Sequence, residues 1–141
     1  MSYDNDRISF YTSMNTLWGE TTPIRFDTIQ DQDKITVGSD PWIHCNIDHS
    51  DTQQKSLGAN TAVLYQTLGM FMIDVYDRKE KGFAQILKYA DILRLHFMGR
   101  SLNSNTIRVT SVSILKREPF QGWNSRRVMV NFESNEYTNR N

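Results

Sequence analysis

Apolar side chains recur at helical spacing in two stretches of the chain. The first begins at Asp4 or Asn5, either of which can cap a helix, and ends before Gly19. The second spans residues 83–97. We therefore expect two amphipathic helices that each turn one side toward a core. These sides comprise Ile8, Phe10, Tyr11, Met14, Leu17 and Trp18 in the first helix, and Phe83, Ile86, Leu87, Ala90, Leu93 and Phe97 in the second.

Alternation of apolar and polar residues with a two-residue period predicts the strands. It is clearest in residues 42–48 and 61–76, and it returns in residues 106–116 and 125–133. Residues 23–27 begin with a proline and are expected to form a short edge strand, where a missing N–H is tolerated. The side chains expected to face the core are Ile43, Cys45, Ile47, Phe71, Ile73, Val75, Val128, Val130 and Phe132.

Four features interrupt this pattern. Gly69 lies within a strand and predicts a bulge or a close approach of another group. The apolar phase changes near Ser111, which predicts a second bulge. Residues 48–60 are polar and too numerous for a tight turn, so we expect a protruding arm. Residues 134–141 are also polar and are expected to form a flexible tail.

The order of these elements is helix, strand, strand, strand, helix, strand, strand. It predicts one α+β domain over residues 1–141, with the first helix inside residues 1–22. We expect a mostly antiparallel sheet of four to five strands, two helices packed on one face, and a long β-hairpin arm.

Composition narrows the classes of function. Sixteen basic and sixteen acidic residues cancel, which argues against a strongly basic nucleic-acid surface. The single cysteine, Cys45, cannot form a disulfide within the chain. No apolar run reaches the roughly 20 residues that span a bilayer, and the polar, acidic start is unlike a signal peptide. We expect a protein made in the cytosol without a membrane partner.

Four neighbouring residues are of types that can bind a metal. His44, Cys45, Asp48 and His49 lie close together in the sequence and all can bind a metal. On a strand, however, His44 and Cys45 point to opposite faces, and the sequence offers no second cluster of ligands. We predict that the protein holds no metal and no cofactor.

The chain also contains residue types that can act in catalysis. Asp74, Asp77 and Glu80 are close in sequence, but nothing aims two of them at one pocket, so we interpret them as solvent-facing or interface carboxylates. Cys45 has no evident partners for nucleophilic catalysis, and we expect it to be a small buried residue. His96 is expected to be a solvated residue near the end of the second helix. We predict no catalytic residues and no enzyme activity.

An ordered set of short motifs extends over residues 5–133. It consists of Pro41-Trp42-Ile43, Leu57-Gly58, Gly69-Met70-Phe71-Met72-Ile73-Asp74-Val75, Gly82-Phe83-Ala84, Ala90-Asp91-Ile92-Leu93 with Phe97, and Arg127-Val128-Met129-Val130-Asn131-Phe132. In this order and spacing the chain resembles the tail terminator, or tail-completion, proteins of long-tailed bacteriophages of the lambda type. It departs from many relatives in its longer N-terminal part, so the resemblance assigns no role to residues 1–22.

The resemblance implies a structural protein of the virion, assembled in the host cytoplasm and located in the tail or neck. A hexameric ring would cap the last ring of the tail tube, stop its growth and offer its other surface to the head connector, or stopper, protein. DNA would pass through the ring without sequence-specific binding. The alternatives are a head-completion or stopper protein of the neck and a non-viral protein-binding module.

Three surfaces are candidates for these contacts, because a ring needs two different complementary patches on each subunit. The predicted subunit interface comprises Trp42, Met70, Met72, Tyr76 and Met129. The arm that contacts a neighbour or the tube comprises Asp51, Gln53, Gln54, Lys55 and Leu57. The charges that meet the tube or line the lumen are Arg78, Lys79, Lys81, Arg126 and Arg127.

Overall fold

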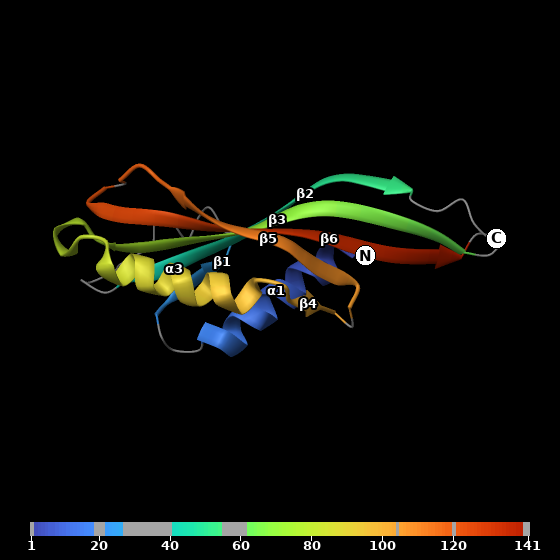
Figure 1. Cartoon of the computed structure of the whole chain (residues 1–141), viewed down its shortest axis with the longest axis horizontal. Coiled ribbons are helices and arrows are strands. Elements are labelled where there is room, and N and C mark those ends of the chain that lie inside the picture. Colours follow the sequence, from blue (N-terminus) through green and yellow to red (C-terminus); the bar gives the residue numbers. More distant parts are fainter. Residues whose placement is uncertain are drawn as a thin grey trace.

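The computed structural model describes residues 2–18, 22–26, 41–54, 62–103, 105–119 and 121–139. Its elements run in the order expected from the sequence, with a 3₁₀ turn and a short strand in addition. They are α1 (Ser2–Trp18), β1 (Ile24–Phe26), β2 (Trp42–Gln54), β3 (Ala62–Arg78), η1 (Lys79–Lys81), α3 (Ala84–Phe97), β4 (Ser101–Leu102), β5 (Ile107–Lys116) and β6 (Trp123–Asn139). Figure 1 shows α1 and α3 on the same side of a long, twisted sheet.

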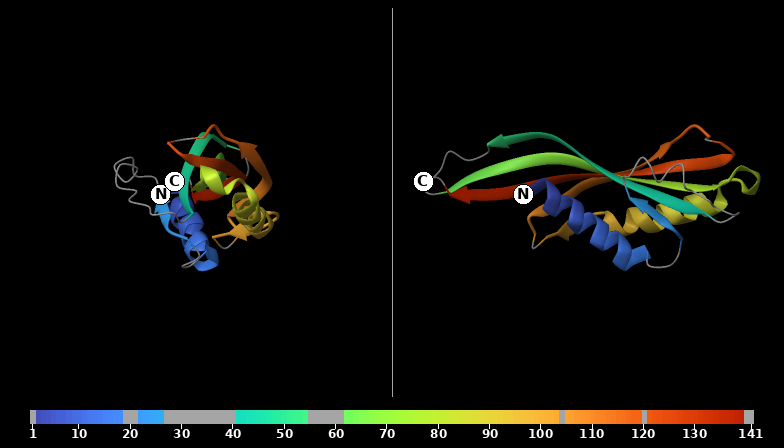
Figure 2. Two further views of the ribbon diagram at one scale, coloured as in Figure 1. Left: turned by 90° about the vertical axis from the view of Figure 1, so that its left-hand side faces the viewer. Right: turned by 180° about the vertical axis from the view of Figure 1, so that it is seen from behind.

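The predicted α+β class with a mostly antiparallel sheet is confirmed. Among the described residues the sheet has six strands in the order β1-β2-β3-β6-β5-β4, rather than four to five. Only β1, which pairs with β2, is parallel to its neighbour. Figure 2 shows that the sheet twists strongly along its length, as right-handed strands require.

Two polar segments are strands. Residues 48–54 were expected only as part of a protruding arm, whereas the prediction of a flexible tail was wrong for residues 134–139. Residues 48–54 continue β2 and pair with β3, as far as Gln54 opposite Tyr65. Residues 134–139 continue β6 and also pair with β3, as far as Asn139 opposite Ala62. Both polar segments satisfy their backbone hydrogen bonds by pairing with β3, so no apolar alternation was needed to make them strands. Residues 55–61, where a hairpin arm would close, lie outside the described residues.

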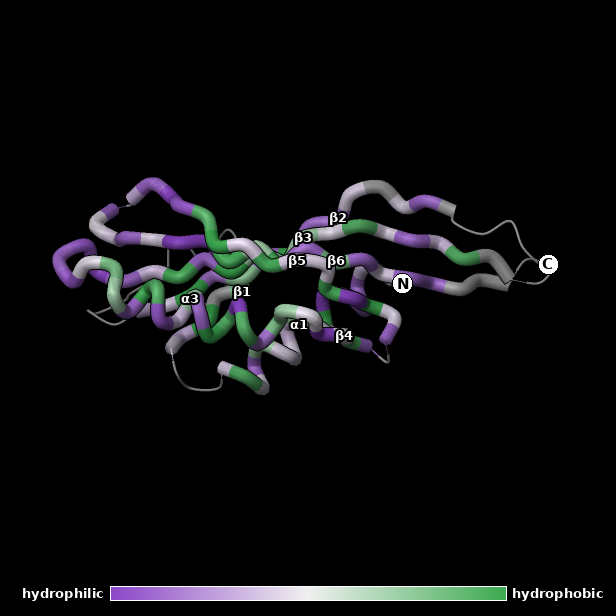
Figure 3. Tube along the Cα trace, in the orientation of Figure 1, coloured by the Kyte–Doolittle hydropathy of each residue, from purple (hydrophilic) through white to green (hydrophobic). Residues whose placement is uncertain are grey.

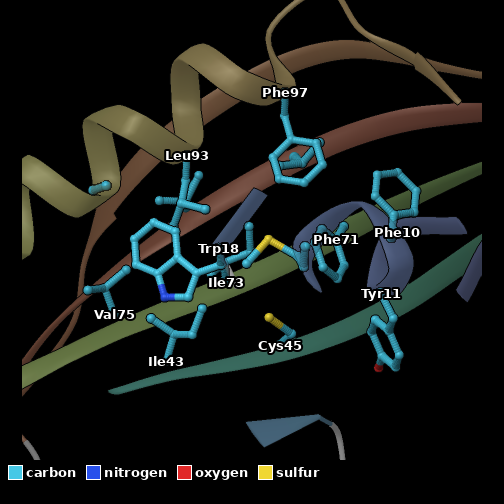
Figure 4. Packing of buried hydrophobic residues seen from close by; sticks show 14 of the residues in the cluster. Phe10, Tyr11, Trp18, Ile43, Cys45, Phe71, Ile73, Val75, Leu93 and Phe97 are labelled. Atoms are coloured by element: carbon cyan, nitrogen blue, oxygen red, sulfur yellow. The ribbon is translucent and has the colours of Figure 1, made fainter. Parts of the chain in front are cut away.

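The core lies between the helices and one face of the sheet. Ile43, Cys45, Phe71, Ile73 and Val75 are completely buried, which confirms the predicted inward face. Figure 4 shows these residues under Phe10, Trp18, Leu93 and Phe97 of the two helices. The ring of Phe10 stacks on that of Phe71, with 4.8 Å between centroids, and its centroid lies 6.1 Å from that of Phe97. Helices α1 and α3 therefore share one core. In Figure 3 hydrophobic residues gather where the helices face the sheet.

The helix boundaries and two of the core predictions need correction. α1 begins at Ser2, so Asp4 and Asn5 lie inside its first turn rather than at its cap. Ile8 is 48% exposed and Leu87 is 47% exposed, although both were predicted to face the core. Ile8 and Leu87 lie outside the arc of their helix that holds its buried residues. Gly19 lies outside the described residues.

Both predicted irregularities in the strands are confirmed. A Cβ atom on Gly69 would lie 2.4 Å from Cζ of Phe132 and 2.9 Å from the backbone oxygen of Asp48. Only glycine allows these groups to approach so closely. The pairing of β5 with β6 shifts between Val109 and Ser111, where the sequence changes phase.

Candidate functional site

The side of the sheet opposite α1 and α3 carries all five residues of the predicted subunit interface; we call it the open face. Residues that lie directly opposite each other on paired strands share a face. Trp42 is opposite Tyr76, and Met72 is opposite Met129, so all four belong to the open face as predicted. The open-face residues at the centre of the sheet are Trp42, His44, Asn46, Met70, Met72, Asp74, Tyr76, Ser125, Arg127 and Met129.

Asp74 is the centre of a buried ion cluster on this face. Its carboxylate accepts hydrogen bonds from Nε and Nη2 of Arg127 at 2.8 and 3.2 Å, and from Nη1 of Arg117 at 2.6 Å. The prediction that Asp74 is solvent-facing or part of an interface was wrong, because its side chain is 5% exposed. Hydrogen bonding to Asp74 raises the pKa of Arg127. The cluster fixes β3, β6 and the segment after β5 to one another.

Asp77 and Glu80, the other two carboxylates of this group, behave differently. Asp77 is buried and accepts a hydrogen bond from the backbone N–H of Arg78 at 2.8 Å, so it too was wrongly predicted as a solvent-facing or interface carboxylate. Glu80 is exposed in η1, as predicted. The three carboxylates do not converge on one pocket.

An aromatic cluster covers the end of the open face near η1. Trp42 stacks on Tyr76, with 4.1 Å between ring centroids, and Trp123 meets Trp42 edge-on at 5.8 Å. Trp42 and Tyr76 were predicted to be exposed interface residues, but they are only 4% and 9% exposed. Burial, followed by the charge of Asp74, raises the pKa of the Tyr76 hydroxyl. These two rings are therefore packed within the subunit.

The methionines of the open face remain partly exposed. Met72 of β3 and Met129 of β6 lie directly opposite each other, and Met70 lies two residues before Met72 in β3. Leu68, two residues beyond, is 50% exposed. We call Leu68, Met70, Met72 and Met129 the methionine patch. Methionine side chains adapt to an imperfectly matched surface, which suits them to a contact with another protein.

The three arginines among the five predicted surface charges make contacts within the subunit. Arg78 lies over the ring of Trp123 at 4.3 Å, and Arg126 lies over the ring of Phe83 at 4.1 Å. Arg127 is bound to Asp74, as described above. Lys79 and Lys81 are exposed in η1. The three arginines of the set therefore help to hold the subunit together, and the two lysines lie in an exposed turn.

The predicted arm is placed only in part. Asp51, Gln53 and Gln54 belong to β2, and Gln53 is exposed. Lys55 and Leu57 lie outside the described residues. What the structure does describe is a β2–β3–β6 extension (Thr52–Gln54, Ala62–Thr67 and Asn135–Asn139) that continues beyond the pairing of β5 with Ser134 (Figure 1).

The sequence pattern did not reveal a second polar cluster between α1 and this extension. Asp6 is buried against His49 of β2 and Ser134 of β6. A polar residue on the apolar side of a helix was the available signal. His96 was also misjudged, because it contacts Ser13 of α1 at 3.1 Å, and burial lowers its pKa.

In the described part of the chain no three His, Cys, Asp or Glu side chains are grouped as metal ligands. Burial raises the pKa of the Cys45 thiol, which keeps it protonated and unreactive. None of the helices described is both long and apolar enough to cross a bilayer.

Comparison with known proteins gives a fold but no family. No protein-family model matches the chain, and no curated protein matches its sequence. Seven chains of known structure match it. One of them covers 100% of this chain and 97% of its own length, with a TM-score of 0.61 and 18% sequence identity. At that identity the likeness supports a shared fold alone.

Proposed function

We propose that this protein is a tail terminator of a long-tailed bacteriophage. It assembles into a ring, a hexamer by family resemblance, that caps the tail tube, stops its polymerisation and presents a surface to the head connector. The ordered motifs over residues 5–133 support this proposal, and so does the α+β fold with its antiparallel sheet. On this proposal the protein is structural, has no enzymatic activity and lies in the neck or tail of the virion.

The methionine patch is the observation that carries the proposal. Neither α1 nor α3 packs on the open face, and Leu68, Met70, Met72 and Met129 leave apolar surface there. Apolar patches on a sheet face favour association with another protein. A subunit of a closed ring needs such a surface for its neighbour. The proposed interface therefore leaves out Trp42 and Tyr76, which pack within the subunit. It includes Leu68 together with Met70 and Met72 of β3.

The finer features of the assembly follow from the same proposal. β2 and β3 belong to a long hairpin arm, and Asp51, Gln53, Gln54, Lys55 and Leu57 contact a neighbouring subunit or the tail-tube protein. Lys79 and Lys81 face the tube or the lumen, through which DNA passes without sequence-specific contacts.

The patch is tested by the double substitution Met70→Asp and Met72→Asp. Two carboxylates would be desolvated at the interface, so we expect the variant to remain folded but monomeric. Light scattering after size-exclusion chromatography would measure particle mass as a multiple of the 16.5 kDa chain, and circular dichroism would verify folding. The control is Thr12→Asp with Asn15→Asp, which adds the same charge at exposed positions of α1 and should leave the ring intact. Intact rings from the methionine variant would refute the interface.

A further inference from the structure

One buried carboxylate joins the first turns of α1 to two strands. Oδ2 of Asp6 lies 3.0 Å from Nε2 of His49 in β2, and Oδ1 accepts a hydrogen bond from the Ser134 hydroxyl in β6 at 2.8 Å. Asp6 is 1% exposed. Because β3 lies between β2 and β6 in the sheet, this side chain holds α1 across three adjacent strands.

Aromatic and hydroxyl contacts continue the same attachment onto the β2–β3–β6 extension. The ring of Tyr3 stacks on His49 with 4.1 Å between centroids and an interplanar angle of 4°. The Tyr3 hydroxyl lies 2.9 Å from that of Thr52, which in turn lies 2.8 Å from the hydroxyl of Thr67 in β3. His49 also meets Phe132 edge-on at 5.7 Å. The first turns of α1 thus contact the extension at Thr52 and reach Thr67 through it, while Asp6 holds His49 and Ser134, which lie just before the extension in the sheet.

The charge on Asp6 opposes this attachment. Burial raises the pKa of Asp6 above its ordinary 3.8, and the hydrogen bonds from His49 and Ser134 counter that effect only in part. Glu136 of β6 adds a like charge, and among the described groups that act on Asp6 only His49 can offer the opposite one. Asp6 and Ser134 also line an open polar cavity of about 210 Å³ with Asn5 and Glu136, so a proton can reach Asp6 without unfolding.

We propose that Asp6, His49 and Ser134 form a proton-controlled docking contact, in which α1 holds the β2–β3–β6 extension most tightly when Asp6 is protonated and releases it more readily when Asp6 is ionised. A protonated Asp6 can still satisfy both neighbours, because its carbonyl oxygen accepts from the Nε2–H of His49 while its hydroxyl donates to the Ser134 oxygen. The contact does not depend on the protein being a tail terminator.

The direction of the pH dependence follows from linkage. A carboxyl whose pKa is higher in the folded state binds its proton more tightly there. Its stabilising contribution is complete below pH 3.8, the ordinary pKa, and is lost as the pH rises through the raised value. The extension should therefore open more often at neutral pH than at pH 4.

Asp6→Asn separates charge from hydrogen bonding in the full chain. The amide oxygen can accept from His49 and the amide nitrogen can donate to Ser134, so both contacts remain without a charge. Hydrogen–deuterium exchange read by mass spectrometry compares this variant with the wild type at matched pH. At pH 7 we expect peptides from residues 62–67 and 135–139 to exchange about threefold to tenfold more slowly in Asp6→Asn. The difference should shrink toward pH 4.

Two further variants complete the test. Asp4→Asn removes an exposed carboxylate from the same turn, paired with Arg7, and should exchange like the wild type. His49→Gln keeps a donor but cannot carry a charge, so it should retain or steepen the pH dependence. The proposal is overturned if Asp6→Asn matches the wild type at both pH values, if its effect is equal at both, or if the change is as large in α3 as in the extension. Loss of the pH dependence in His49→Gln, with Asp6→Asn unchanged, would also overturn it.

Discussion

Gly69 is the residue at which two strands and an aromatic ring approach most closely. A methyl group there would lie 2.4 Å from Phe132 Cζ and 2.9 Å from the Asp48 oxygen. We expect Gly69→Ala to lower the free energy of unfolding by about 2 kcal/mol, because the ring and the strand must both move. Urea denaturation would measure the loss.

The ring and the backbone contribute separately to this effect. Phe132→Leu shortens the side chain at the point of collision, so the two substitutions should be non-additive and the double variant should recover part of the loss. The backbone oxygen of Asp48 still opposes the new methyl group, so recovery should be incomplete. A Gly69→Ala protein within about 0.5 kcal/mol of the wild type would show that the close approach is not as described.

Asp74 allows a second prediction, by comparison with a surface pair of the same chemistry. Asp74→Asn leaves Arg117 and Arg127 without their counter-charge on a mostly buried site, and we expect a loss of about 2 to 3 kcal/mol. Asp91 also binds an arginine, Arg94, at 2.8 Å, but its side chain is 55% exposed. Asp91→Asn should therefore cost less than about 1 kcal/mol. Equal losses in chemical denaturation would contradict the buried role of Asp74.

At the scale of elements, the polar end of β6 is the most consequential difference from expectation. Residues 134–139 pair with residues 62–67 of β3 and supply Ser134 to the contact with Asp6. A chain that ends after Glu133 should therefore lose amide protection in residues 62–67, while residues 71–76 in the core keep theirs. Hydrogen exchange would measure both segments.

A chain that ends after Asn139 keeps every β6 pairing and is the matched control. It should protect residues 62–67 as the full chain does. If the shorter chain, ending after Glu133, also protects them, the end of β6 does not stabilise β3.

Periodic patterns predicted the elements whose side chains alternate between core and solvent. The inward faces of β2, β3 and β6 were predicted correctly because every second residue at the centre of these strands is apolar and buried. Ile43, Ile73 and Val128 are examples. The patterns failed for residues 48–54 and 134–139, which are strands through backbone pairing and carry no apolar alternation. They also missed β4, which is only two residues long.

The candidate site was predicted less well, for a related reason. Which face Trp42, Tyr76 and the methionines occupy follows from alternation, and it was correct. Whether they are covered depends on neighbours that are distant in sequence. Trp123 lies 81 positions after Trp42 in the printed sequence, and Arg117 lies 43 positions after Asp74. Single-sequence periodicity carries no information on such pairs.

At the scale of the whole molecule, both helices that the structure describes cover the same side of the sheet (Figure 1). The open face is partly closed by its own ion and aromatic clusters, and the methionine patch is an apolar part of what remains exposed there. The end of the sheet away from η1 carries the β2–β3–β6 extension (Figure 1), and we infer that its attachment to α1 is proton-controlled. The proposed ring joins these features, because an interface on the sheet and a projecting extension supply two different contacts per subunit.

Electron microscopy of phage particles assembled without this protein tests the proposed function most directly. A terminator limits tail growth, so the account predicts tails longer than normal and without heads, and normal tail length on adding back the wild-type chain. Tails of normal length, with heads that leak DNA, would contradict a terminator and would instead identify a stopper protein of the neck.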